Sequence, residues 1–244
     1  MEDFSHMMTD KAKQIGCLNT TFKNAHGLDE EGHLSTAYDM AIIASYMYNN
    51  EILKEVVGMK VATIKINDKS VNLKNTNRLL KTNKYVKGGK TGYTGNADRC
   101  LAEIATKDDF SIITIVLGAT DTNIRFNTAD KLINKTFDMY KVYNLEDKLK
   151  WDINIPVIKG TDKYYNDSYF DSLKIPLIEY ELEDLVIKEN IVKVLNAPVY
   201  KSKYLGNIEV KIGNESILYK DIYSNYSIDK MSIVSYFKVI INGI

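Results

Sequence analysis

The chain contains few of the residues that build disulfide frameworks or metal sites. Its 244 residues contain two cysteines and three histidines. Cys17 and Cys100 could form a disulfide in an oxidising compartment, but a lone pair of cysteines is more often two buried thiols. His6, His26 and His33 have no acidic or cysteine partner at metal-ligand spacing, so we expect no metal site and no cofactor.

Excess charge and long apolar runs are also missing. The 32 basic residues balance the 32 acidic ones, which argues against a nucleic acid as partner because binding to phosphates requires an excess of positive charge. No stretch resembles a signal peptide or a transmembrane helix. The apolar share of 45% over 244 residues is enough to bury the cores of two modest domains.

The most informative stretch is Lys90-Thr91-Gly92, which lies within 86–95. The lysine offers a fixed positive charge, the threonine a hydroxyl, and the bare glycine lets a substrate backbone come close. Residues 100–105 and 110–118 read as strands joined by the polar turn 106–109, so residues 90–93 are predicted to open an antiparallel meander. An extended peptide along such a strand would gain main-chain hydrogen bonds, with its carboxylate near the lysine and threonine.

Two other interpretations of this tripeptide must be weighed. A given tripeptide occurs by chance in a chain of this length at a rate of roughly a few per cent, so the surrounding sequence decides. Gly89-Lys90-Thr91 also resembles part of a phosphate-binding P-loop. That loop needs glycine where Lys84 stands and a helix where this chain is predicted to form a strand.

The surrounding sequence resembles a known family. Residues 21–29, 33–41 and 75–80, together with Lys90-Thr91-Gly92, are similar to segments of the low-molecular-mass penicillin-binding proteins, the serine D-alanyl-D-alanine carboxypeptidases. The resemblance covers residues 1–145 best. It implies an α+β fold, in which an incomplete penicillin-binding domain with helices on an antiparallel sheet precedes a small all-β sandwich.

The resemblance also implies an activity. A serine attacks the carbonyl between two D-alanines of a peptidoglycan stem peptide, an acyl-enzyme forms, and water releases the shortened peptide. It implies that the full-length protein binds β-lactam antibiotics and works on the extracytoplasmic face of the cytoplasmic membrane. Lys90, Thr91 and Gly92 would hold the substrate. Arg125 matches a family arginine near the substrate carboxylate, and the alternative is a surface arginine at a helix start.

The family's other two motifs are the difficulty, because both precede its Thr-x-Phe-x-Asn segment, and only about twenty residues precede that segment here. Ser227–Lys230 and Ser235–Lys238 spell Ser-x-x-Lys, and Ser70–Asn72 spells Ser-x-Asn, but their order and context are wrong. We therefore expect the nucleophile and its base to be missing and the chain to be inactive alone. The alternatives are a non-catalytic wall-peptide-binding remnant and a related β-lactamase or transpeptidase; the β-rich second domain disfavours a β-lactamase.

Helical periodicity predicts three helices in the first domain. The first should end at Gly16; because no capping residue precedes it, we expect the chain to begin inside a domain. The second should begin at a capping box of Thr36 and Asp39, and the third should span 122–140. The predicted inward residues are Phe4, Met7, Met8, Ala12 and Ile15, then Met40, Ile43, Ala44 and Met47, then Phe126, Ala129, Leu132, Ile133 and Phe137.

The sequence divides into three predicted parts: a partial carboxypeptidase domain at 1–145, a β-sandwich at 146–230 and an amphipathic tail at 231–244. Strands of the sandwich are expected at 153–158, 173–178, 191–195 and 208–212. The tail places Ile233, Val234, Phe237, Ile240, Ile241 and Ile244 on one helical face. Such a tail could lie on a membrane surface, and the alternative is packing against the sandwich.

Overall fold

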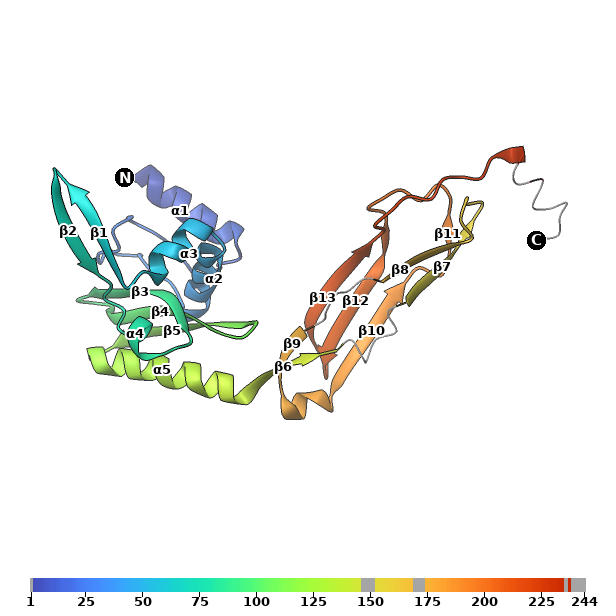
Figure 1. Cartoon of the computed structure of the whole chain (residues 1–244). Coiled ribbons are helices and arrows are strands. Elements are labelled where there is room, and N and C mark those ends of the chain that lie inside the picture. Colours follow the sequence, from blue (N-terminus) through green and yellow to red (C-terminus); the bar gives the residue numbers. More distant parts are fainter. Residues whose placement is uncertain (1, 146–151, 169–173, 235–236, 238–244) are drawn as a thin grey trace. The chain divides into compact units, whose positions relative to one another are not determined.

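The computed structural model describes residues 2–145, 152–168, 174–234 and 237, and it divides the chain into two compact units (Figure 1). The first unit is Met1–Met139 and the second is Tyr140–Ile244. Helices and antiparallel sheets occur together, which confirms the predicted α+β class.

A three-stranded antiparallel sheet organises the first unit. It consists of β3 (Val86–Thr94), β4 (Asp98–Lys107) and β5 (Phe110–Ala119), in the order β3-β4-β5. This is the predicted meander. Strand β3 lies at the edge of this sheet, while β4 is central and buries Leu101, Ile104 and Ala105.

Helices cover both faces of this sheet (Figure 1). On one face lie α4 (Leu79–Thr82) and α5 (Thr122–Met139), and on the other lie α2 (Ala37–Tyr48) and α3 (Glu51–Gly58). The α5 face buries Phe126, Ala129, Ile133 and Phe137, as predicted. Leu132 was wrongly placed inside: it is 43% exposed, because it lies off the stripe that faces the sheet.

The first helix, α1 (Glu2–Gln14), ends where predicted. Gly16 adopts a positive φ of 101°, and the amide of Cys17 donates to the carbonyl of Ala12. Ala12 is buried, as predicted, but Phe4 and Met7 were wrongly placed inside: both are exposed, and Ser5 and Thr9 are buried instead. A hydrogen bond explains this choice: the Thr9 hydroxyl accepts from the amide of Phe22 at 2.9 Å.

Helix α2 begins at Thr36, whose hydroxyl accepts a hydrogen bond from the amide of Asp39 at 3.1 Å. The predicted capping box is only half formed. The buried Asp39 carboxylate instead accepts from the amide of Asn19 and the hydroxyl of Thr20, both at 2.7 Å. These hydrogen bonds, led by that of Thr20, lower the pKa of Asp39.

A β-hairpin follows α3. Strands β1 (Val61–Ile66) and β2 (Lys69–Lys74) pair antiparallel around Asn67 and Asp68, whose φ angles are 47° and 63°. Two-residue hairpin turns of this kind require positive φ, which Asn and Asp tolerate better than most residues. The alternation of residues within 64–73 predicts two short strands around Asn67, Asp68 and Lys69, and the observed pairing confirms them.

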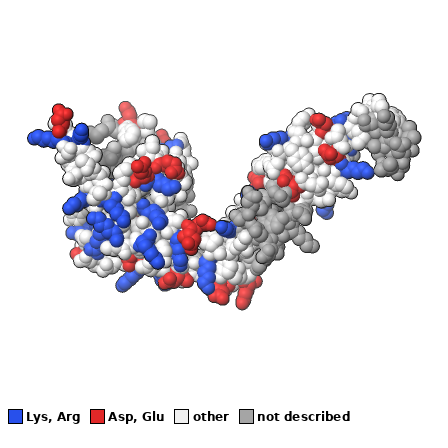
Figure 2. Space-filling view, viewed as in Figure 1, with Lys and Arg blue, Asp and Glu red and all other residues white. Residues whose placement is uncertain are grey.

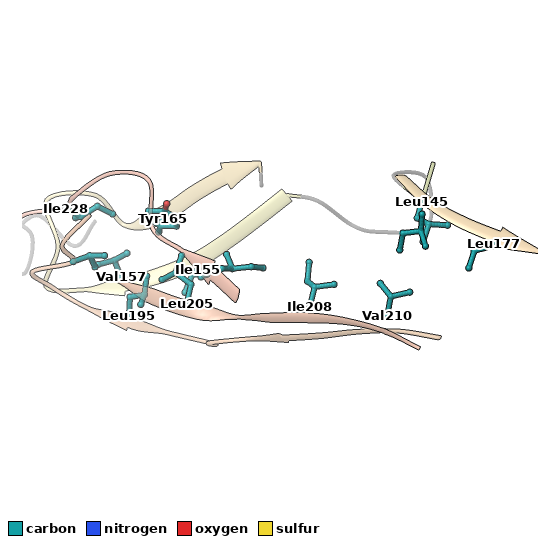
Figure 3. Close-up of a cluster of buried hydrophobic side chains, with 13 residues drawn as sticks. Leu145, Ile155, Val157, Tyr165, Leu177, Leu195, Leu205, Ile208, Val210 and Ile228 are labelled. Carbon is teal, nitrogen blue, oxygen red and sulfur yellow. The ribbon is translucent and has the colours of Figure 1, made fainter. Parts of the chain in front are cut away.

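Within its described residues the second unit is built mainly from strands, with one short 3₁₀ helix and helical residues at 233, 234 and 237. It contains β6 (Tyr140–Asn144), β7 (Asp152–Ile158), β8 (Tyr164–Ser168), β9 (Lys174–Ile178), η2 (Glu179–Leu182), β10 (Leu185–Ile191), β11 (Leu195–Asn196), β12 (Tyr204–Ile212) and β13 (Glu215–Tyr223). The sheets are β10-β12-β13 and β11-β7-β8, together with the pair β6-β9. A cluster of buried side chains, most of them from these strands, forms the core (Figure 3).

Sequence periodicity found β7, β9 and β12 but failed elsewhere in this unit. Residues 191–195 are not one strand, because Ile191 ends β10 and Leu195 begins β11. Strands β8 and β13 were not predicted. In β13 only Ile222 is buried, so the alternation of apolar and polar residues is weak.

The predicted amphipathic tail falls mostly outside the described residues. Positions 235–236 and 238–244, which include Ile240, Ile241 and Ile244, are not described, and Ile233, Val234 and Phe237 are exposed. Within the described part of the chain, no helix has the length and apolar character needed to cross a bilayer.

Candidate functional site

Lys90, Thr91 and Gly92 lie consecutively on the edge strand β3. Lys90 and Gly92 are exposed and Thr91 is half-buried, so the side chains alternate between the two faces of the strand. The Lys90 ammonium donates to the carbonyl of Thr91. The tripeptide is in a strand and is followed by β4, as predicted, and a P-loop would need a helix there.

The Thr91 hydroxyl lies 2.7 Å from the hydroxyl of Thr76. Thr76 belongs to the segment 75–78, which leads into α4. Its neighbour Asn75 anchors this segment through two hydrogen bonds. The Asn75 amide group donates to the carbonyl of Met59 at 2.9 Å, and its backbone amide donates to the carbonyl of Lys60 at 3.0 Å. Sequence reasoning missed Thr76, although the segment 75–80 was among those that resemble the family.

Arg125 lies on the first turn of α5, and its side chain contacts the backbone of Gly92, the last residue of the tripeptide. Its Nη1 donates to the carbonyls of Gly92, at 3.1 Å, and Cys100, at 3.3 Å, which are opposed across the β3–β4 ladder. The side chain is buried, so the interpretation as a surface arginine is wrong. Burial lowers the pKa of Arg125, but a guanidinium remains protonated in proteins.

Glu103 lies on β4, directly opposite Gly89. Gly89 is the residue that precedes Lys90 on β3. Its side chain is completely buried, and its Oε1 accepts from the amide group of Asn77 at 2.7 Å. Burial raises the pKa of Glu103 to about 8, against a smaller lowering by the Asn77 hydrogen bond. Sequence reasoning missed this carboxyl group too, because Glu103 lies in a run that reads simply as a strand.

A cavity of about 530 Å³ adjoins Gly92. Residues of the loop 22–35, Met40 of α2, and Tyr93 and Cys100 of the sheet line it. The loop is held by Asn24, whose side chain donates to the carbonyl of Leu28 and accepts from the amide of Gly27. A concave apolar surface next to exposed polar groups is typical of binding sites for small molecules or peptides.

Other candidates from the sequence lie elsewhere. Ser70 is exposed on strand β2, and the hydroxyl of Ser227 accepts from the amide of Lys201 in the second unit. Ser235 lies outside the described residues. Cys17 and Cys100 are both free thiols.

Two histidines on the loop 22–35 have local roles. The Nδ1 of His26 accepts from the amide of Leu28 at 3.2 Å. His33 similarly accepts from the amide of Lys23. Neither ring lies in a cluster of metal-binding side chains within the described ranges.

Positive charge surrounds the candidate strand. Lys and Arg side chains gather on one face of the first unit, over the β3–β5 sheet and α5 (Figure 2). Within this sheet, Lys87 and Lys90 are exposed on β3 and Arg99 is half-buried on β4. Such a surface attracts anionic ligands at long range.

Comparison with known proteins shows which family the sequence resembles. The family model of the D-alanyl-D-alanine carboxypeptidases matches residues 1–121. The D-alanyl-D-alanine carboxypeptidase DacF of Bacillus subtilis is 33% identical over 243 residues, which are 97% of this chain and 61% of that protein. DacC of Escherichia coli is 30% identical over 218 residues, which are 88% of this chain and 54% of that protein.

Solved structures show the same fold. Penicillin-binding protein 5 from Haemophilus influenzae superposes with a TM-score of 0.73 at 23% sequence identity, over 94% of this chain and 67% of that one. The chain thus spans somewhat more than half the length of the two curated relatives named above. Residues 1–121 thus match the D-alanyl-D-alanine carboxypeptidase family, and the chain is similar to members of that family over most of its length.

Proposed function

We propose that β3 binds the C-terminus of a peptidoglycan stem peptide ending in D-Ala-D-Ala, as the substrate-holding part of a serine-type carboxypeptidase. The single observation that best supports this is the exposure of Lys90 and Gly92 on an edge strand. An incoming peptide can pair with the free side of such a strand. Peptidoglycan lies outside the cytoplasmic membrane, so the proposed reaction takes place there.

Each side chain of the site has a role in this proposal. The Lys90 ammonium neutralises the terminal carboxylate, and the Thr91 hydroxyl donates to it. Gly92 leaves room for the substrate backbone. Arg125 is buried against the carbonyls of Gly92 and Cys100, so we give it the role of holding this end of β3 and adding positive charge beneath the carboxylate.

The proposed reaction needs a serine as well. Its hydroxyl attacks the carbonyl between the two D-alanines, its proton passes to the departing amine, and water later cleaves the acyl-enzyme. Ser70 and Ser227 lie on a hairpin and in the second unit, not in a Ser-x-x-Lys helix. We therefore propose that these 244 residues supply the binding strand and not the nucleophile.

A titration with diacetyl-L-Lys-D-Ala-D-Ala, followed by amide NMR shifts, tests the binding role. We expect saturable shifts on residues 86–94 with the free acid and none with the C-terminal amide of the same peptide, because the amide lacks the carboxylate. Lys90→Ala should weaken binding at least tenfold, since a charged hydrogen bond is worth about 1.5–3 kcal/mol.

Lys87→Ala is the matched control, because Lys87 is another exposed lysine on β3. It should bind the peptide nearly as the unchanged chain does. Equal binding of acid and amide, or equal losses in the two lysine variants, would show that β3 does not recognise the carboxylate.

A further inference from the structure

A buried acid beneath the candidate strand has no place in the proposed reaction. Glu103 has no exposed surface, and its Oε2 finds no hydrogen-bond partner among the described residues. A carboxyl group in such surroundings is less favourable than an apolar side chain of similar size. Core packing therefore does not explain why this position holds an acid.

The surroundings of Glu103 point toward the candidate site. A Cβ added to Gly89 would lie 2.8 Å from Glu103 Oε1, so the carboxyl group fills the space that the missing side chain leaves. Gly89 and Thr91 are two residues apart, so they share one face of β3. The acid thus lies under the backbone that immediately precedes Lys90.

Two side-chain hydrogen bonds on adjacent residues, Asn77 with Glu103 and Thr76 with Thr91, connect the buried acid with the candidate strand. Glu103 accepts from the side chain of Asn77, whose own Oδ1 accepts from the amide of Leu79 at 3.1 Å. The backbone amide of Asn77 donates to the side chain of Asn75 at 2.9 Å. Thr76 lies between these two fixed asparagines.

We infer that Glu103 is a positioning residue, which acts through Asn77 to hold the Thr76 hydroxyl against Thr91. Without the Asn77 anchor, the segment 75–78 would be held at its start by the Asn75 contacts with Met59 and Lys60, and at its end by Arg78, which donates to the Asn123 side chain at 2.8 Å. A fixed Thr76 orients the Thr91 hydroxyl and offers a second hydroxyl beside it. The consequence for peptide binding rests on the proposed function, whereas the positioning of Thr76 does not.

The positioning is measured in the peptide-free chain by the NMR scalar couplings that report χ1 of Thr76. The unchanged chain and Glu103→Gln should show one rotamer, because glutamine can also accept from Asn77. Glu103→Ala should show averaged couplings at Thr76, while Thr136, whose hydroxyl bonds to the carbonyl of Leu132, keeps its own. A single Thr76 rotamer in Glu103→Ala would overturn the inference.

A double-mutant cycle tests the link to binding, with diacetyl-L-Lys-D-Ala-D-Ala as the probe. Thr76→Val and Glu103→Ala should each weaken binding about tenfold, as expected for one lost hydrogen bond. Combined, they should lose no more than either alone, and Glu103→Gln should restore affinity. Losses that multiply would mean that Glu103 does not act through Thr76.

The two proposals fail in different ways. If the unchanged chain does not bind the peptide, the proposed function is wrong, and the Thr76 couplings still decide the inference. If the peptide binds normally but Glu103→Ala binds as well as the unchanged chain, the proposed function stands and the inference is wrong.

Discussion

Gly89 and Gly92 lie on the same strand and lack side chains for different reasons. A Cβ at Gly89 would lie 2.5 Å from the carbonyl oxygen of Ala102, whereas a Cβ at Gly92 would meet nothing closer than the Cβ of Cys100 at 3.7 Å. Gly89 is therefore required by packing. Gly92 has room for a side chain, which agrees with a role in admitting a ligand.

This difference predicts that alanine at Gly89 mainly affects stability, whereas alanine at Gly92 mainly affects peptide binding. Gly89→Ala should lower the free energy of unfolding by about 1–3 kcal/mol, because β3 must move. Gly92→Ala should change it by less than about 0.5 kcal/mol and yet weaken peptide binding. Urea unfolding and the NMR titration measure the two effects.

Gly95→Ala is the control for Gly92→Ala, because its Cβ would lie 3.9 Å from the nearest atom, in the Asp29 carboxylate. It should affect neither stability nor binding. A Gly92→Ala chain that is as unstable as Gly89→Ala would show that Gly92 is also a packing requirement.

The buried Glu103 predicts a pH dependence of stability. Its pKa is about 8 in the folded chain against the ordinary value of 4.5. Between these values the folded state binds the extra proton, so stability should fall as the pH rises from about 5 to 8, by up to about 1 kcal/mol per pH unit. The free energy of unfolding of Glu103→Gln should vary less with pH over this range, and at pH 8 it should be higher than that of the unchanged chain.

Urea unfolding of both chains at pH 5, 6.5 and 8 checks this prediction. The neutral Asn77 is the hydrogen-bond partner of Glu103, so the difference between the two curves reports the Glu103 carboxyl. Parallel curves would mean that Glu103 titrates near its ordinary pKa in the folded chain.

At the scale of elements, helix α2 places Met40 beside the cavity that adjoins Gly92. Its start depends on the Thr36 hydroxyl, which accepts from the amide of Asp39. Thr36→Ala should cost about 1 kcal/mol of unfolding free energy. Ser45→Ala, at an exposed position on the same helix, should cost little, and an equal loss in both variants would argue against the cap.

The sequence predicted the elements that have a clear period. The meander and the 61–74 hairpin follow from alternation and turn residues, and α5 follows from its apolar stripe. The inward face of α1 was missed because Thr9 is fixed by the amide of Phe22, a contact between residues far apart in sequence. Periodicity contains no information about such contacts.

The same limit applies to the site. Lys90, Thr91 and Gly92 could be found because they are adjacent, and Arg125 could be found because the sequence resembles a family. Thr76 and Glu103 could not: Thr76 meets Thr91 across 15 positions, and Asn77 meets Glu103 across 26. Only the folded chain brings these groups together.

At the scale of the whole molecule, the proposal separates binding from acylation. The first compact unit contains the candidate strand β3, and the second unit consists mainly of β-strands. Because the proposal places the nucleophile outside the 244 residues, incubation with benzylpenicillin should leave the intact mass unchanged. A stoichiometric gain of one penicillin would contradict this, and peptide mapping would then identify the acylated serine.

Contact between the peptide and β3 is the central claim, and intermolecular NOEs measure it most directly. With the isotope-labelled chain and unlabelled diacetyl-L-Lys-D-Ala-D-Ala, we predict NOEs from the D-Ala methyl groups to the protons of Thr91 and Gly92. NOEs confined to surfaces other than β3, with saturable binding still present, would contradict the account.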